Sequence, residues 1–134
     1  MKEAARDWLD LAALDLRAAQ RIVGDPDLVP VALFHAQQAV EKALKALLEE
    51  RALSVPKTHD LERLHRMLDG HFDLPVKEDS LRLLAALYIS TRYPVGMGLL
   101  PAGRPTREEG ERLVIFAEEV MVSVRDLLED HRPR

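Results

Sequence analysis

The sequence predicts an all-α fold, an antiparallel up-and-down bundle of four long helices and one short helix in a single domain spanning residues 1–134. Apolar residues recur three or four positions apart and do not alternate, which is the helical period. Clusters of Gly, Pro and Ser break the pattern at 24–26, 54–56, 70–75 and 92–105. A chain of 134 residues supports one core, and each amphipathic helix needs a neighbour to bury its apolar side.

The first helix is expected over about 4–23 and the second over about 30–53, with Pro30 tolerated in the first turn. Asp15 falls beside the apolar stripe of the first helix. A carboxylate near the core usually pairs with a cation, for which Lys42, Lys45 or Arg92 could serve. The stripe itself consists of Trp8, Leu11, Ala12, Ala19, Ile22 and Val23.

The third helix is short, about 60–69, and Gly70 is a plausible C-terminal stop. The fourth helix runs over about 78–91 and ends before Pro94, because proline disfavours helix in the preceding residue. The fifth begins with Thr106-Arg107-Glu108-Glu109, the pattern of a capping box.

The amino-acid composition excludes several classes of function. Without cysteine there are no disulfides, thiolate nucleophiles or Cys-based zinc sites. A net charge of −4 argues against a non-specific polyanion binder, but it permits a local basic site. No run of eighteen apolar residues and no leader peptide are found, so we expect a cytoplasmic protein without a membrane segment.

The histidines do not form a metal-binding pattern. His59, His65 and His71 are each six residues apart, which scatters them around a helix. Glu62 and His65 form one Glu-x-x-His pair, but a di-iron site needs a second copy, which the sequence lacks. We therefore expect no metal and no cofactor.

The second helix has an apolar side and, in projection, an opposite side that is polar except for Phe34. One interpretation is a solvated face with Glu/Lys pairs. The other is an outward contact face, with Phe34 as anchor or stacking surface and polar donors for an anionic ligand or a second subunit. The residues of this side are Phe34, His35, Gln37, Gln38, Glu41, Lys42 and Lys45.

Two short stretches could add to such a site. In Lys57-Thr58-His59-Asp60-Leu61, Thr58 could cap the third helix with Asp60 in its first turn, and Lys57 and His59 could form an anion pocket. Arg92 could cap the last carbonyls of the fourth helix or bind phosphate. The predicted ligand-binding set is Phe34, His35, Gln38, Lys42, Lys57, His59 and Arg92.

These stretches together resemble the HEPN family (higher eukaryotes and prokaryotes nucleotide-binding) over nearly the whole chain. The similarity rests on Trp8 with Ala12, Asp15 and Leu16, on FHAQQAVEKALKALL, on KTHDL, on RYP and on the final amphipathic helix. It implies a five-helix bundle that often forms homodimers. It also implies nucleotide or RNA binding and, in many relatives, pairing with a minimal nucleotidyltransferase, sometimes as toxin and antitoxin.

Some branches of that family are metal-independent ribonucleases with Arg, four to six residues, then His. Arg66 with His71 and Arg125 with His131 fit by spacing. However, His71 lies past the third helix, His131 lies in the tail, and no histidine follows Arg92 at this distance. We therefore expect a binding partner without catalysis, and assign no catalytic residue.

Two alternatives stay open. One is an endoribonuclease toxin in which His35 or His59 acts as acid or base beside Arg92. The other is a purely structural homodimer in which the polar side of the second helix and the loop from Met97 to Leu100 meet a second copy.

Overall fold

The computed structural model describes residues 1–92 and 104–129, with side chains described for 1–88 and 104–129. Within these residues the chain forms five α-helices and no strand, which confirms the predicted all-α bundle. The helices are α1 (Glu3–Ile22), α2 (Val29–Glu50), α3 (Leu61–Met67), α4 (Glu78–Arg92) and α5 (Arg107–Glu129), and a 3-10 turn, η1 (Pro26–Leu28), precedes α2. No helix in these ranges is both long and apolar enough to cross a membrane.

The helix ends follow from local hydrogen bonds. α2 stops three residues before the predicted end, because Ala52 adopts a φ of 53° and the Leu53 N–H donates to the Leu48 carbonyl at 2.9 Å. The cap of α3 is Asp60, whose Oδ1 accepts from the Arg63 N–H at 3.2 Å. The prediction of Thr58 as cap is therefore wrong, although its Oγ1 accepts from the Asp60 N–H at 3.2 Å.

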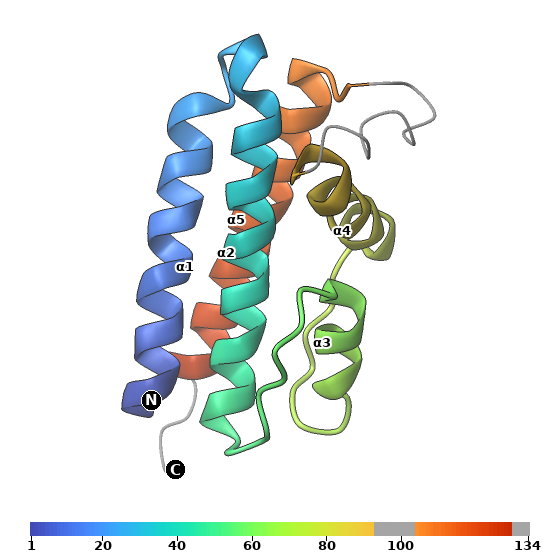
Figure 1. Ribbon diagram of the computed structural model, residues 1–134. Coiled ribbons are helices and arrows are strands. Elements are labelled where there is room, and N and C mark those ends of the chain that lie inside the picture. The colour runs from blue at the N-terminus through green and yellow to red at the C-terminus, as the bar shows by residue number, and fades with distance from the viewer. Residues whose placement is uncertain (93–103, 130–134) are drawn as a thin grey trace.

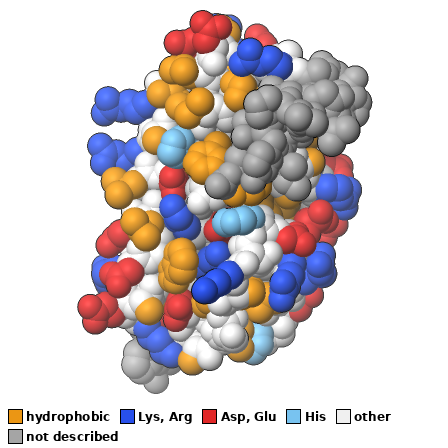
Figure 2. Space-filling view, viewed as in Figure 1, with side chains coloured by type: hydrophobic (Ala, Val, Ile, Leu, Met, Phe, Trp, Pro, Cys, Tyr) orange, Lys and Arg blue, Asp and Glu red, His pale blue; other side chains and the backbone are white. Residues whose placement is uncertain are grey.

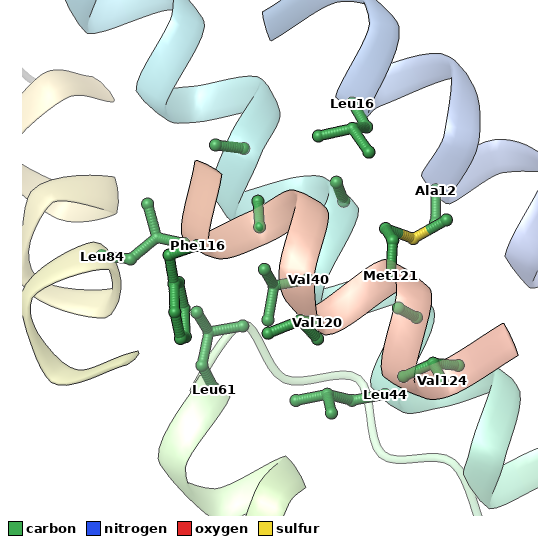
Figure 3. Packing of buried hydrophobic residues seen from close by; sticks show 14 of the residues in the cluster. Ala12, Leu16, Val40, Leu44, Leu61, Leu84, Phe116, Val120, Met121 and Val124 are labelled. Atoms are coloured by element: carbon green, nitrogen blue, oxygen red, sulfur yellow. The ribbon is translucent and has the colours of Figure 1, made fainter. Parts of the chain in front are cut away.

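α2 is the central helix of the bundle. It packs against each of the other four α-helices, and Figure 1 shows α1 beside it, α5 behind both, and α3 and α4 on its other side. In the core, Phe116 of α5 lies near Leu61 of α3 and Leu84 of α4, while Met121 of α5 points toward Ala12 of α1 (Figure 3). Because it is surrounded, α2 presents little of its surface to solvent.

The predicted stripe of the first helix is partly wrong. Leu11 is 48 % exposed, and Leu9 and Leu16 are buried in its place. Trp8 is only partly buried, on the side of α1 that faces the polar residues of α2. The buried side of α1 is thus rotated away from the position assigned by the sequence pattern.

Candidate functional site

The residues on the polar side of α2 are buried or half-buried, which corrects the prediction that this side faces outward. Gln37 is 0 %, Glu41 3 % and Lys45 5 % exposed. His59, in the connection between α2 and α3, reaches this row of side chains, and Trp8 of α1 lies beside Lys45. Buried charges are costly unless they are paired, so these residues must have partners inside the fold.

Glu41 is the centre of the first group of partners. Its Oε1 lies 2.7 Å from His59 Nδ1, and its Oε2 accepts from Lys45 Nζ at 3.1 Å. Gln37 Nε2 donates both to Glu41 Oε1 at 3.3 Å and to the His59 carbonyl at 3.1 Å. The Lys45 ammonium also lies 5.4 Å from the centre of the Trp8 ring. Among the described residues, every buried side-chain nitrogen and oxygen has a hydrogen-bond partner.

Asp15 is the centre of a second, similar group. Its Oδ1 lies 2.9 Å from His35 Nδ1, and its Oδ2 accepts from Lys42 Nζ at 2.6 Å. The expectation that Asp15 pairs with a cation is confirmed, with Lys42 as the partner. Each of the two carboxylates therefore holds one histidine and one lysine, and we call these groups the Asp15 clamp (Asp15, His35, Lys42) and the Glu41 clamp (Glu41, His59, Lys45).

A row of aromatic rings joins the two clamps. The centre of Phe34 lies 5.3 Å from that of His35 and 5.8 Å from that of Tyr88, and the Phe34 and Tyr88 rings are nearly parallel at 19°. Tyr88 in turn lies 5.2 Å from His59. Beside this row, the half-buried Gln38 donates from Nε2 to Oε1 of the buried Gln37 at 2.8 Å.

The clamps fix how each imidazole can act. In a neutral histidine, a carboxylate beside Nδ1 favours the proton on Nδ1 and leaves the lone pair on Nε2. The charges of Asp15 and Glu41 are balanced by Lys42 and Lys45, so protonation of a histidine would make the cluster positive. The arrangement therefore combines stacking rings with two oriented imidazoles, of which the His59 side chain is 56 % and the His35 side chain 31 % exposed.

The structure brings together five of the seven predicted ligand-binding residues, namely Phe34, His35, Gln38, Lys42 and His59. Lys57 is exposed, two residues before His59. The side chain of Arg92, like the loop from Met97 to Leu100, lies outside the described residues.

The two Arg–His matches do not join this cluster. Arg66 and His71 are both exposed at the end of α3, where the His71 N–H donates to the Leu68 carbonyl at 2.9 Å. Arg125 is exposed on α5, and His131 lies outside the described residues.

Sequence reasoning missed Tyr88, which is only 7 % exposed and stacks on Phe34. Tyr88 follows the buried Leu81 and Leu84 at helical spacing, so the sequence pattern could have predicted that the Tyr88 ring lies on the buried side of α4. The role of Trp8 beside Lys45 was missed as well, because the apolar spacing assigns Trp8 to the core stripe.

Fold and cluster together define an antiparallel five-helix bundle whose central helix carries His35, Lys42 and Lys45 of the clamps, while His59 comes from the connection between α2 and α3. The HEPN domain family matches residues 5–127, and the chain belongs to this family. The resemblance inferred from the motifs is thereby confirmed. The family is generally related to nucleotides or RNA, and its domains commonly dimerise.

Two solved structures share the fold. The crystal structure of TT1696 from Thermus thermophilus is 36 % identical, with a TM-score of 0.73 covering 93 % of this chain and 98 % of that one. The crystal structure of ST0689, an archaeal HEPN homologue, is 23 % identical, with a TM-score of 0.67 covering 94 % of this chain and 98 % of the other. No curated protein matches the chain.

Proposed function

We propose that this protein is a binding module for a nucleotide or an RNA-type anion, and that the clamp cluster is its site. The observation that carries the proposal is the aromatic row, which is partly exposed at Phe34 and ends at a clamped histidine on each side. Aromatic side chains bind unpaired bases by stacking, with little dependence on sequence. Histidine and lysine groups near the row could bind phosphate.

The clamps change the roles within the predicted set. Lys42 is held by Asp15 at 2.6 Å, so its main contribution is to position Asp15 and thereby His35. Lys57 and His59 are more exposed and are better placed to meet an anion. The proposed ligand therefore contacts Phe34, His35, Lys57 and His59, and the remaining residues support them.

The binding test uses the full chain with ATP and with a short, labelled single-stranded oligoribonucleotide. Phe34→Ala and His59→Ala are each expected to weaken binding about tenfold, since one base stack contributes roughly 1–3 kcal/mol. His71→Ala is the matched control, because His71 is exposed outside the cluster. Absence of binding to either ligand, or equal affinity of all variants, would contradict the proposal.

An endoribonuclease is the second candidate, and the His–carboxylate contacts favour it. Asp15 and Glu41 orient two imidazoles so that each Nε2 is left to accept or donate a proton, as general acid–base cleavage requires. The test is incubation of single-stranded RNA with the protein and EDTA. Cleavage that is lost in His59→Ala would establish this function, whereas loss only in His71→Ala would assign it to Arg66 and His71.

We further propose that the module works in the cytoplasm, as a homodimer or with a minimal nucleotidyltransferase in a toxin–antitoxin-like pair. This part of the proposal is supported by family membership. It is tested by co-expression with a small nucleotidyltransferase encoded in an adjacent reading frame. Co-purification at a fixed ratio is expected, and separate elution of the two proteins would count against the pair.

A further inference from the structure

The two clamp lysines are already engaged within the chain. Lys42 Nζ donates to Asp15 Oδ2 at 2.6 Å, and Lys45 Nζ donates to Glu41 Oε2 at 3.1 Å. Each ammonium charge is therefore compensated by a carboxylate that it touches. A clamp gains a net positive charge only when its histidine is protonated.

The carboxylates also decide which nitrogen of each ring can donate. Nδ1 lies 2.9 Å from a carboxylate oxygen in His35 and 2.7 Å from one in His59. Within the part of the chain that the structure describes, Nε2 of neither ring has a hydrogen-bond partner. A neutral ring that donates from Nδ1 carries a lone pair on Nε2 and can only accept there. The other tautomer would place the Nδ1 lone pair against a carboxylate oxygen at hydrogen-bond distance, so it is disfavoured.

A phosphodiester oxygen is itself a negatively charged acceptor, so it has no hydrogen bond to make with Nε2 of a neutral clamp histidine. Protonation turns both ring nitrogens into donors, and the bonds from an imidazolium to the carboxylate and to the anion are both charge-assisted. We propose that the site binds an anion together with a proton, which the clamp histidine that contacts the anion takes up from water. This inference rests on the proposed binding function and adds how that binding is regulated.

The surroundings of the two imidazoles agree with this coupling. Three carboxylates and three ammonium groups lie on the neighbouring elements, so their formal charges cancel while both histidines are neutral. Each proton taken up therefore adds one positive charge to a neutral site, and anion binding and protonation favour each other. The charged and titratable neighbours in the described ranges are Asp15 of α1, Glu41, Lys42 and Lys45 of α2, Lys57 and Asp60 of the connection between α2 and α3, and Tyr88 of α4.

The test measures the affinity of the full chain for a short oligouridylate with a hydroxyl group at both ends. Neither uracil nor the phosphodiester changes charge between about pH 5.5 and pH 8, the range in which histidine ordinarily titrates. At constant ionic strength, the wild type is expected to bind more tightly as the pH falls. The gain approaches about tenfold per pH unit for each proton taken up.

Matched variants separate proton uptake from stacking. His35→Gln combined with His59→Gln keeps polar side chains that do not titrate, so its weaker binding should be independent of pH. Phe34→Ala removes a stacking surface and should bind more weakly at every pH with the slope of the wild type. His71→Gln, outside the cluster, should behave as the wild type. Circular dichroism at each pH checks that every variant stays folded.

Two further measurements address the proton directly. Calorimetry in two buffers with different heats of ionisation should show proton uptake on binding, and none in the double glutamine variant. Nitrogen NMR of the ligand-free protein at about pH 8 should show neutral His35 and His59 protonated on Nδ1. Binding with the same affinity at every pH, or a pH slope that survives in the double variant, would overturn the coupling alone. Absence of binding at every pH would overturn the proposed function together with it.

Discussion

At the scale of single residues, the unusual feature is that charged groups occupy the interior of a small bundle. Glu41 and Lys45 lie four residues apart on α2 and are 3 % and 5 % exposed. Taking such a pair out of water costs free energy that the mutual attraction only partly offsets. The pair is sustained here by additional contacts with His59, Gln37 and Trp8. Removing one member is therefore more harmful than removing both.

We expect Glu41→Ala to lower the free energy of unfolding by about 3–5 kcal/mol, because Lys45 would remain buried without its carboxylate. Glu41→Ala combined with Lys45→Met should recover most of this loss. Urea unfolding followed by the fluorescence of Trp8, the single tryptophan, measures both.

The control for this prediction is an exposed ion pair. Lys77 and Glu119 lie 3.5 Å apart with side chains 71 % and 53 % exposed, so Glu119→Ala should change stability by less than about 1 kcal/mol. If Glu41→Ala cost no more than this control, the Glu41 clamp would not be a stabilising centre.

At the scale of elements, the start of α5 shows a local signal that the sequence predicted correctly. The Glu109 N–H donates to Thr106 Oγ1 at 3.1 Å, and the Thr106 N–H donates to Glu109 Oε1 at 2.9 Å, which together form the expected capping box. Two hydrogen bonds lower the pKa of Glu109 from its ordinary value of 4.5. The larger effect comes from the bond with the Thr106 backbone, and the smaller from the bond with the Thr106 side chain. The N-terminus of α5 is thus stabilised by an ionised carboxylate.

Thr106→Ala is expected to destabilise the protein by about 1 kcal/mol at neutral pH, as for other cap deletions. A lowered pKa contributes stability above the ordinary value of 4.5, and the contribution is lost as the pH falls through the folded pKa. Thr106→Ala keeps the backbone N–H at position 106, so only the part of this contribution that comes from the Thr106 side chain differs between wild type and variant, and the difference should shrink in part below that value. Thermal unfolding at a series of pH values measures it, and a difference that widens in acid would contradict the assignment.

Gly110 lies one helical turn after Thr106, and close packing against other residues requires a glycine there. A Cβ at this position would lie 2.8 Å from Val29 Cγ1 and 3.2 Å from Val23 Cγ2. In an open helix, Gly→Ala stabilises by up to about 1 kcal/mol, but here we expect Gly110→Ala to destabilise by roughly 1–3 kcal/mol through overpacking.

A double-mutant cycle with Val29→Ala checks the cause. Gly110→Ala should cost less, or become favourable, when Val29 is shortened, because the nearest clash is removed. Additive effects of the two substitutions would show that Val29 is not the limiting contact.

At the scale of the whole molecule, the bundle could be predicted because each helix carries its own apolar spacing and its own stop signals. The sequence also predicted that Asp15 pairs with a cation, but it left Lys42, Lys45 and Arg92 open, and the structure identifies Lys42 as the partner. The burial of Gln37, Glu41 and Lys45 could not be predicted, because a projection of α2 alone does not show that the 51–60 connection and α1 approach its polar side. His59 reaches Glu41 from eighteen residues away in sequence, and that approach is a property of the assembled fold.

This dependence on assembly predicts how the site would be lost. His59 is held near Tyr88 and Glu41 partly because α3, which begins two residues later, is anchored in the core by Leu61 beside Phe116 (Figure 3). On the face of the molecule drawn in Figure 2, which has the same view as Figure 1, hydrophobic, acidic and basic side chains are interspersed. Because Leu61 anchors α3, we expect Leu61→Ala, a cavity mutation costing about 2–5 kcal/mol, to loosen the connection between α2 and α3 before it affects the α1–α2 pair.

Native-state hydrogen exchange distinguishes local loosening from general destabilisation. In Leu61→Ala, amides of residues 57–67 should exchange faster while those of α1 and α2 keep their protection, and ligand affinity should fall as in His59→Ala. Leu128→Ala is the matched control, because Leu128 is a similarly buried leucine at the far end of α5, at 1 % exposure. It should weaken protection throughout the bundle without a selective effect on 57–67. If both variants opened the same amides, α3 would not be an independent support for the site.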